Sequence, residues 1–364
     1  MSTKLGLVGL PNVGKSTLFN ALTTAHAAVA PYPFTTTDPN IGLAPVDDPR
    51  LQALAERLSP ERIVPTMLEF VDIAGLVKGA HQGEGLGNQF LSHLFGVDAL
   101  LHVVRCFADE NVPHTIGKVD PVRDIEIINT ELLLKDLEMI SRRREKEQKL
   151  AKGGDKRALQ LMTHLERWRE ALSAGTPIRR LEDAPQDRPA AFHLDLLTAK
   201  PVLYAANVGE GPLDADAPQL TALQALVNRE GAELILCSAK LETELAELDP
   251  ADRAAMRQEL GAAESALPQV IRRGYALLRL LTFFTTASKI LQAWTVTQGT
   301  KAPQAAGVIH TDFEQKFIRA EVIQSDVLLH CGSEANARTQ GLLRLEGKEY
   351  AVQDGDVIHF KIGA

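Results

Sequence analysis

The sequence Gly9-Leu10-Pro11-Asn12-Val13-Gly14-Lys15-Ser16 matches the pattern G-x4-G-K-S of a phosphate-binding loop. It continues the apolar run 5–10 and leads into a helical pattern, which is the strand–loop–helix context that the chemistry requires. Glycines let the backbone curl so that successive N–H groups face the phosphates, and the helix adds its positive N-terminal end. The stretch therefore predicts a nucleoside triphosphate site.

Within this loop, the last two residues have distinct roles. We expect Lys15 to bridge the β- and γ-phosphates and so to serve catalysis, and the Ser16 hydroxyl to bind Mg²⁺. The nucleotide-binding residues expected here are Asn12, Val13, Gly14, Lys15, Ser16 and Thr17.

Three further segments predict the parts that respond to the γ-phosphate. Asp72-Ile73-Ala74-Gly75 reads as D-x-x-G directly after an apolar strand; Asp72 would hold the Mg²⁺ shell through water, and the Gly75 N–H would sense the γ-phosphate. The glycine-rich run 79–87 that follows favours a mobile switch, with an ordinary surface loop as the alternative. In the run 31–40, a threonine of Thr35-Thr36-Thr37 can complete the Mg²⁺ shell, and spacing alone leaves the choice among the three open.

The base is predicted to be read by Asn207-Val208-Gly209-Glu210, where guanine-specific proteins of this type carry N-K-x-D. Glu210 is one methylene longer than aspartate, and Val208 lacks the lysine stem that lies along guanine. Losing a paired hydrogen-bonding contact changes specificity by orders of magnitude, so we expect a purine site without strong guanine preference. Ser238 and Ala239, after the last strand, would supply backbone contacts to the base.

The pattern of apolar runs predicts an α/β fold with a P-loop, doubly wound, mostly parallel sheet. Residues 131–200 interrupt it: two helix-forming stretches flank Gly153-Gly154, which indicates a helical-hairpin insertion. We therefore expect a nucleotide-binding domain over 1–280 and a small α+β domain over 281–364. The expected strands of the first domain are 5–10, 67–72, 99–104, 201–206 and 233–237.

Composition suits a soluble protein: 45% of the residues are hydrophobic, 24% are charged, and the formal net charge is -8. The three cysteines lie far apart, as in reduced cytosolic proteins, and no apolar stretch is long enough to cross a bilayer. We expect a cytoplasmic protein without a membrane segment, and nothing demands an oligomer, so we expect a monomer.

Against the acidic background, the hairpin concentrates Arg142-Arg143-Arg144, Lys146, Lys149, Lys152, Lys156 and Arg157.

Taken together, Gly-Leu-Pro-Asn-Val-Gly-Lys-Ser, Pro-Phe-Thr-Thr-Thr-Asp-Pro-Asn (33–40), Asp-Ile-Ala-Gly-Leu-Val-Lys-Gly-Ala (72–80) and Asn-x-x-Glu resemble the YchF family, the Obg-like ATPases. The resemblance spans nearly the whole chain, because residues 302–313 are similar to the family's TGS domain. It implies a ubiquitin-like β-grasp fold for that domain, ATP preferred over GTP, Mg²⁺ ligands at Ser16 and Thr36, and association with ribosomes. Val208 departs from the methionine of some relatives.

Catalysis is expected to be slow, because Leu76 stands where Ras-type enzymes place a water-orienting glutamine. His114 is our candidate for that task, which the resemblance supports; a solvated or structural histidine is the alternative. Asn12 suggests a K⁺ ion beside the phosphates, although shaping the loop by hydrogen bonding is an equal alternative.

Ribosomal RNA is the expected partner of the basic hairpin, with a merely solvated helical face as the alternative. Further protein partners would bind through the TGS domain. Two other functions stay open: a nucleotide-sensing adaptor in which hydrolysis is incidental, and a GTPase of relaxed specificity despite Glu210.

Overall fold

The computed structural model describes residues 3–24, 40–73, 86–109, 111–181, 194–209, 217–259 and 265–363. The chain forms two compact units, one made of Met1–Gly42 and Glu69–Val270 and the other of Leu43–Leu68 and Ile271–Ala364. This grouping differs from the boundary expected at residue 280, since an internal segment joins the C-terminal unit. In the described ranges, no helix combines the length and apolar character needed to cross a membrane.

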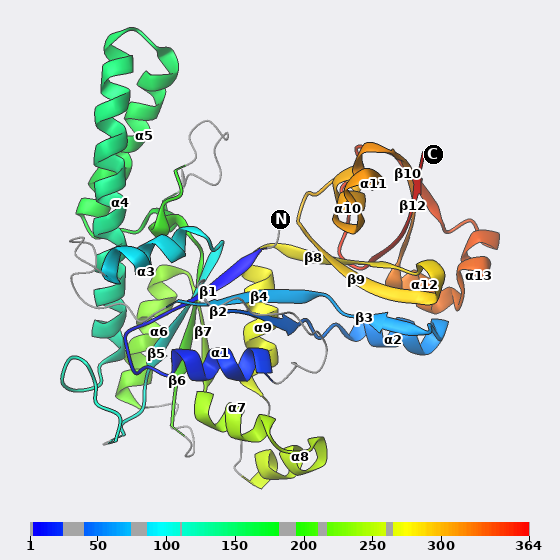
Figure 1. Ribbon diagram of the computed structural model, residues 1–364, viewed down its shortest axis with the longest axis horizontal. Helices are drawn as coiled ribbons and strands as arrows, with labels where there is room; N and C mark the ends of the chain where they lie inside the picture. The colour runs from blue at the N-terminus through cyan, green and yellow to red at the C-terminus, as the bar shows by residue number, and fades with distance from the viewer. Residues whose placement is uncertain are drawn as a thin grey trace. The chain divides into compact units, whose positions relative to one another are not determined.

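The first unit contains a six-stranded sheet in the order β2-β4-β1-β5-β6-β7 (Figure 1). Strands β4, β1, β5, β6 and β7 run parallel to one another. Every residue of β5 and β6 is buried, which explains why both appear as continuous apolar runs in the sequence. The strands are β1 (Lys4–Val8), β2 (Asn40–Pro45), β4 (Met67–Asp72), β5 (Ala99–Arg105), β6 (Val202–Asn207) and β7 (Glu233–Cys237).

Helices connect these strands, as a doubly wound sheet requires. The one after β1 begins at Lys15, immediately behind the phosphate-binding loop. The helices of this unit outside the hairpin are α1 (Lys15–Thr24), α3 (Leu86–Phe95), α6 (Pro218–Glu230), α7 (Ala239–Ala246), α8 (Pro250–Glu259) and α9 (Ala266–Leu277), the last of which continues into the second unit. Short 3-10 turns occupy Ile178–Arg180 and Leu197–Ala199.

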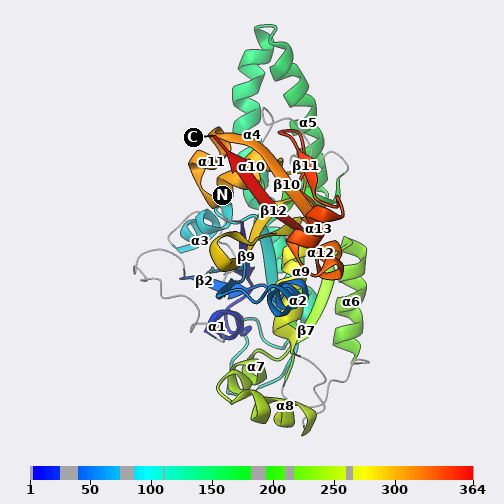
Figure 2. The ribbon, with the colours of Figure 1, turned by 90° about the vertical axis from the view of Figure 1, so that its right-hand side faces the viewer.

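The insertion is an antiparallel helical hairpin of α4 (Pro121–Lys152) and α5 (Lys156–Ser173), which Figures 1 and 2 show extending away from the sheet. The helices join through the predicted glycine pair, where Gly154 has φ +85. Asp155 caps α5 by accepting hydrogen bonds from two backbone N–H groups. A core around the buried Trp168 holds the helices together, so the hairpin has apolar packing of its own.

At the base of the hairpin, a buried carboxylate ties α4 to the chain that returns toward β6. Asp136 accepts hydrogen bonds from the backbone N–H groups of Leu197 and Thr198 and from the Thr198 hydroxyl. Burial raises the pKa of Asp136 to about 6. These bonds fix where the insertion leaves the sheet.

The second unit contains a mixed sheet in the order β11-β10-β12-β8-β9-β3. β8 pairs antiparallel with β9 and parallel with β12, and β10 pairs antiparallel with β12 and β11. This is the strand order of a ubiquitin-like β-grasp, extended by β3. The strands are β3 (Arg62–Val64), β8 (Leu280–Thr285), β9 (Ile290–Thr297), β10 (Phe317–Gln324), β11 (Arg344–Glu346) and β12 (Asp356–Ile362).

This unit has two cores, and the second explains why residues 43–68 belong to it. One core lies around α10, and in the other Leu51 and Leu54 pack with Phe284 and Leu291. β3 adds backbone pairing to β9, so both side chains and main chain bind the segment to the sheet. The helices are α2 (Pro49–Leu58), α10 (Ala302–Ile309), α11 (Thr311–Gln315), α12 (Ser325–Cys331) and α13 (Glu334–Thr339), and a 3-10 turn spans Ala287–Lys289.

Candidate nucleotide site

The phosphate-binding loop connects β1 to α1, and two of its glycines are required by their surroundings. A Cβ on Gly9 would lie 2.6 Å from the carbonyl oxygen of Val103 in the neighbouring strand. Gly14 has φ +88, and a Cβ there would lie 2.1 Å from the amide nitrogen of Asn207. Since backbone and a buried amide cannot yield, any larger residue would distort the loop.

Lys15, Ser16 and Asp72 form one hydrogen-bonded group at the carboxyl ends of β1 and β4. The Lys15 ammonium lies 2.8 Å from one carboxylate oxygen of Asp72, and both side chains are 8% exposed. The Ser16 hydroxyl donates to the other oxygen over 2.7 Å. These are the three residues that the sequence predicts to contact the phosphates and the Mg²⁺ shell.

This donor set suits Mg²⁺. A hydroxyl and a carboxylate oxygen, 2.7 Å apart, are hard ligands of the kind that Mg²⁺ prefers. The described residues contain no cluster of three or more His, Cys, Asp or Glu that could hold a metal.

Asn207, at the end of β6, connects the loop to the segment that precedes α7. Its amide nitrogen donates to the carbonyl oxygen of Val13 over 2.8 Å, and its amide oxygen accepts from the N–H of Ala239 over 3.0 Å. Val208 is buried, and its N–H donates to Cys237. Asn207 thus joins three of the segments predicted to surround the nucleotide, besides any contact with the base.

Phe107 borders this loop and was not predicted as a site residue. It follows β5, and a Cβ placed on Gly209 would lie 3.7 Å from its Cβ. The guanidinium of Arg105 lies over its ring, 4.6 Å from the centroid. The signal available in the sequence was an aromatic residue two positions after a buried strand, at the edge where ligands bind in this fold.

His114 is enclosed rather than exposed toward the loop. Its side chain is 4% exposed, and Nε2 lies 2.8 Å from a carboxylate oxygen of Asp124 at the start of α4. Nδ1 accepts a hydrogen bond from the N–H of Ile116, which leaves the proton on Nε2, donated to Asp124. Next to it, the carbonyl oxygen of Pro113 accepts from Asn12 Nδ2 over 3.2 Å, and Asn12 itself has φ +63.

The structure places some of the predicted site residues, and others lie outside the described part of the chain. The carboxyl edge of the sheet brings together the phosphate-binding loop, Asp72, Asn207, Val208, Ser238 and Ala239. The Ser238 hydroxyl is buried there without a hydrogen-bond partner among described residues. The residues and segments not described are Thr36, Gly75, Leu76, Glu210 and the glycine-rich stretch 79–85.

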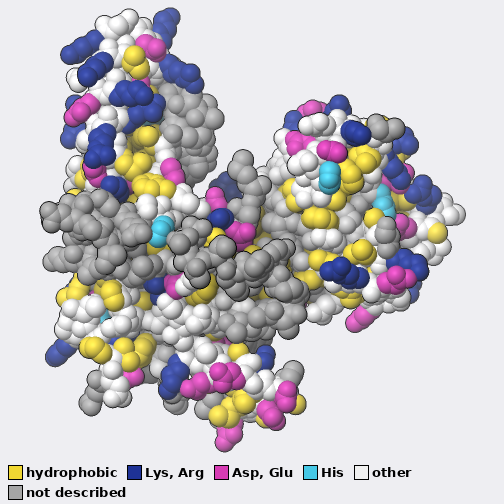
Figure 3. Space-filling view, in the orientation of Figure 1, with side chains coloured by type: hydrophobic (Ala, Val, Ile, Leu, Met, Phe, Trp, Pro, Cys, Tyr) yellow, Lys and Arg dark blue, Asp and Glu magenta, His cyan; other side chains and the backbone are white. Residues whose placement is uncertain are grey.

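The basic hairpin divides into paired and unpaired cations. Arg142, Arg143 and Arg144 form ion pairs with Glu138, Glu147 and Glu166 respectively. Closer to the turn, five exposed cations have no ion pair within the described residues, and Figure 3 shows Lys and Arg side chains gathered around this end. They are Lys146, Lys149, Lys152, Lys156 and Arg157, which we call the tip cations.

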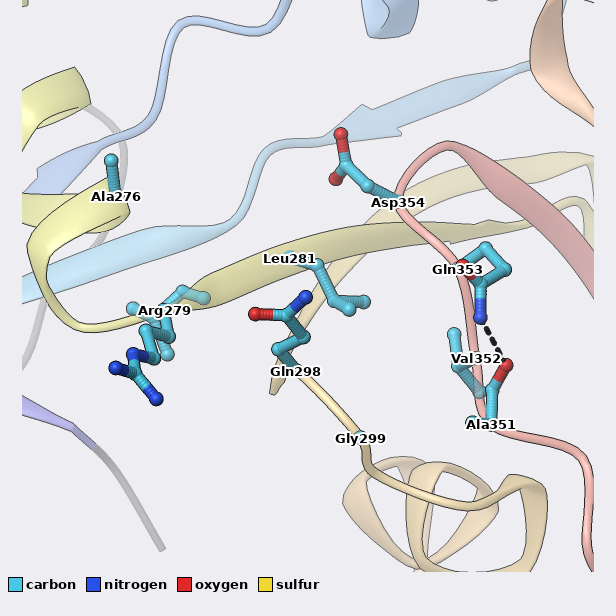
Figure 4. A pocket seen from close by; sticks show the side chains of 10 residues that line it. Ala276, Arg279, Leu281, Gln298, Gly299, Ala351, Val352, Gln353 and Asp354 are labelled. Atoms are coloured by element: carbon cyan, nitrogen blue, oxygen red, sulfur yellow. Dashed lines mark hydrogen bonds between the residues drawn. The ribbon is translucent and has the colours of Figure 1, made fainter. Parts of the chain in front are cut away.

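The C-terminal unit has a cavity of about 550 Å³, shown in Figure 4. Its wall includes the exposed Arg279, whose φ is +51, and Gln298. Asp354 also lines it, but its carboxylate already accepts from Arg50 over 2.7 Å and from the Thr282 N–H over 2.8 Å. Arg279 and Gln298 offer polar side chains to this cavity, and Gln353, whose Nε2 donates to the Ala351 carbonyl oxygen over 2.8 Å, also lines it.

Two families match parts of the chain. Residues 4–144 match the family described as "50S ribosome-binding GTPase", and residues 280–363 match the family YchF-GTPase_C, described as a protein of unknown function.

Relatives match over the full length. "Ribosome-binding ATPase YchF" of Bacillus subtilis is 49% identical over 363 residues, and that of Haemophilus influenzae 50% over 361, each match covering 99% of both chains. "Obg-like ATPase 1" of Pongo abelii is 43% identical, covering 99% of this chain and 92% of its own. The structure titled "Structure of the Schizosaccharomyces pombe YchF GTPase" superposes with a TM-score of 0.86 at 37% identity, covering 99% of this chain and 98% of the other. These matches confirm the predicted fold class.

Proposed function

This chain belongs to the YchF family, and from that premise we propose that it is a ribosome-associated P-loop ATPase. It hydrolyses ATP to ADP and phosphate and acts as a nucleotide-dependent regulatory switch in translation or the stress response. The observation that carries the proposal is the convergence of Lys15, Ser16 and Asp72 at the loop. Relatives that are 49% and 50% identical over the full length carry the name ribosome-binding ATPase.

The reaction relies on positioning and charge rather than on a covalent intermediate. The loop N–H groups hold the phosphates, and Lys15 bridges the β- and γ-phosphates, where negative charge develops as the terminal bond breaks. Ser16 and Thr36 would ligate Mg²⁺ directly, and Asp72 would hold its water. When bound, Mg²⁺ neutralises charge on the phosphate oxygens.

Base preference is proposed to favour adenine. Glu210 in place of aspartate removes the geometry that accepts two hydrogen bonds from guanine, and Val208 removes the lysine stem. Phe107 adds an aromatic face beside Gly209, against which a purine can stack. The relatives' names divide on this point, with ATPase for the curated proteins and GTPase for the solved structure.

Turnover is proposed to be slow, because Leu76 cannot orient water. His114 is the proposed substitute, and since its imidazole bonds to Asp124, it must exchange that partner to reach the attacking water. Asn12 is the proposed neighbour of a K⁺ ion that would place positive charge at the phosphates. Its bond to Pro113 supports the plainer alternative, in which it shapes the loop.

Ribosome association is proposed to run through the hairpin. The tip cations present positive charge that no carboxylate of the described ranges pairs with, and ribosomal RNA offers a dense array of phosphates. Protein partners are proposed to bind the C-terminal TGS domain. The protein is further proposed to work as a cytoplasmic monomer.

The alternative is an adaptor in which bound ATP sets a binding surface and hydrolysis is incidental; slow chemistry at Leu76 favours it. Multiple-turnover phosphate release from ATP, measured with and without ribosomes, separates the two. Stimulation by ribosomes supports the ATPase cycle. Turnover that stays negligible in both, while ATP binding alters ribosome affinity, supports the adaptor.

A further inference from the structure

Arg105, the last residue of β5, is a cation in the interior of the nucleotide unit. Its side chain is 1% exposed. Nε donates to the carbonyl oxygen of Phe107 over 3.1 Å, and Nη2 donates to that of Asp109 over 3.3 Å. Nη1 is buried without a hydrogen-bond partner in the described ranges. Burying a charged guanidinium with one nitrogen unpaired costs free energy. The groups that it does contact therefore indicate which part of the structure it stabilises.

Those contacts all reach one short segment. Besides the two carbonyl bonds, the guanidinium lies 4.6 Å from the centroid of the Phe107 ring, within the range of a cation–π interaction. Arg105 thus holds both the backbone and the ring of the segment 107–109, where the chain leaves the sheet. Because the side chain is buried, these contacts are little screened by water.

This segment lies between the two ends of the nucleotide site. At one end the Cys106 N–H donates to the Asn207 carbonyl oxygen over 2.8 Å, and Phe107 borders Gly209. Further along the chain, the Pro113 carbonyl oxygen accepts from Asn12 of the phosphate-binding loop. Orienting the segment at Arg105 therefore orients an aromatic face next to the predicted base loop.

We propose that Arg105 is a positioning residue for recognition of the nucleobase. It fixes the Phe107 ring before the nucleotide arrives, so that stacking does not require the ring and its backbone to be ordered on binding. Arg105 acts through Phe107, and its hydrogen bonds within the described residues go to Phe107 and Asp109, not to the phosphate-binding loop. This role rests on the proposed function, because it takes adenosine triphosphate as the ligand.

The test is Arg105→Lys, with ATP and inorganic tripolyphosphate as probes. Lysine keeps the charge, but one ammonium on a flexible stem cannot donate to both carbonyl groups while lying over the ring. We expect the Kd for ATP to rise about tenfold, the scale of a desolvated cation–π contact. The Kd for tripolyphosphate should stay unchanged, because the phosphate-binding loop is untouched. Equal weakening of both probes, or of neither, would overturn the role.

Arg253→Lys is the matched control. Arg253 also spans a turn, with Nε donating to Leu245 over 2.9 Å and Nη2 to Ala246 over 3.1 Å and Leu248 over 3.0 Å. The same substitution there removes a similar set of carbonyl bonds away from Phe107. Both affinities should remain those of the wild type.

Phe107→Leu supplies an independent arm that does not depend on Arg105→Lys folding. It should weaken ATP binding and spare tripolyphosphate. In a double-mutant cycle, Arg105→Lys should add little to Phe107→Leu, whereas fully additive effects would show that Arg105 does not act through the ring. A wild-type chain that does not bind ATP would remove the proposed function, and this role with it. Normal ATP binding in the wild type and in Arg105→Lys would remove this role alone.

Discussion

The carboxylate of Asp72 lies 2.8 Å from the ammonium group of Lys15, in an ion pair whose side chains are each 8% exposed. The same carboxylate accepts a hydrogen bond from Ser16. The strand β4 and the phosphate-binding loop are therefore tied together through the groups that the proposed reaction uses. In the proposed reaction, phosphate and Mg²⁺ would replace these contacts.

Removing the carboxylate charge should destabilise the protein. Asp72→Asn leaves the buried ammonium of Lys15 without its counter-charge, and breaking such a pair from one side costs roughly 3–5 kcal/mol. We expect a loss of this size in the free energy of unfolding, measured by urea denaturation without nucleotide. Glu69→Gln is the control, since its pair with Lys4 spans 3.8 Å and is more exposed; it should cost less than about 1 kcal/mol. Equal small losses would contradict the account.

His114→Ala should lower ATP turnover several-fold and leave ATP affinity nearly intact. The imidazole is the proposed group that orients water, and it contacts Asp124 rather than the residues of the phosphate-binding loop. Turnover is measured under saturating ATP, and affinity by titration with a fluorescent ATP analogue. Unchanged turnover would leave His114 with its structural role beside Asp124 only.

Ribosome binding should depend on salt and on the charges of the hairpin. Reversing the charges of Arg142, Arg143 and Arg144 should weaken ribosome binding. Because these arginines are already paired with glutamates, we expect them to contribute less than the tip cations. Replacing Lys149, Lys152 and Lys156 by alanine should weaken it more and lower the slope of log Kd against log salt by about 2. Cosedimentation over a salt series measures both. Binding that withstands both triple variants would point to the TGS domain instead.

Stability should fall with acid partly through His102, a buried histidine of β5. Desolvation by burial lowers the pKa of His102 from 6.5 to about 3. Its contribution is thus fully present above pH 6.5 and is lost as the pH falls toward 3, because the unfolded chain takes up the proton first. Between pH 7 and 5 the loss is roughly 2 kcal/mol. Urea denaturation at both pH values measures this loss. His102→Gln should lack the loss of roughly 2 kcal/mol between pH 7 and 5, one histidine's share, whereas His310→Gln, at an exposed position, should keep it. Equal pH dependence in the wild type and both variants would contradict this assignment.

Much of the nucleotide unit could be predicted because the physical signals there are local. The runs 67–72 and 233–237 coincide with β4 and β7. The runs 99–104 and 201–206 overlap β5 and β6, whose residues are all buried, and strands buried on both faces must be apolar throughout. Gly153-Gly154 also marks the hairpin turn locally, because Gly154 has a positive φ that glycine adopts without strain. The loop itself depends on residues adjacent in sequence.

What could not be predicted depends on partners distant in sequence. The apolar face of α2 shows that Leu51 and Leu54 are buried, but not that their core contains Phe284. An arginine at the end of a strand suggests a surface position, whereas Arg105 is enclosed by the segment that follows it. The bond between His114 and Asp124 joins a loop to a helix, and no spacing rule anticipates it.

The most direct test of the central claim is a comparison of ATP and GTP affinity in one preparation, by competition against the same fluorescent nucleotide. If Glu210, Val208 and Phe107 act as proposed, ATP binds more tightly than GTP. Tighter binding of GTP would contradict the account of base recognition and, with it, the assignment of this chain as an ATPase.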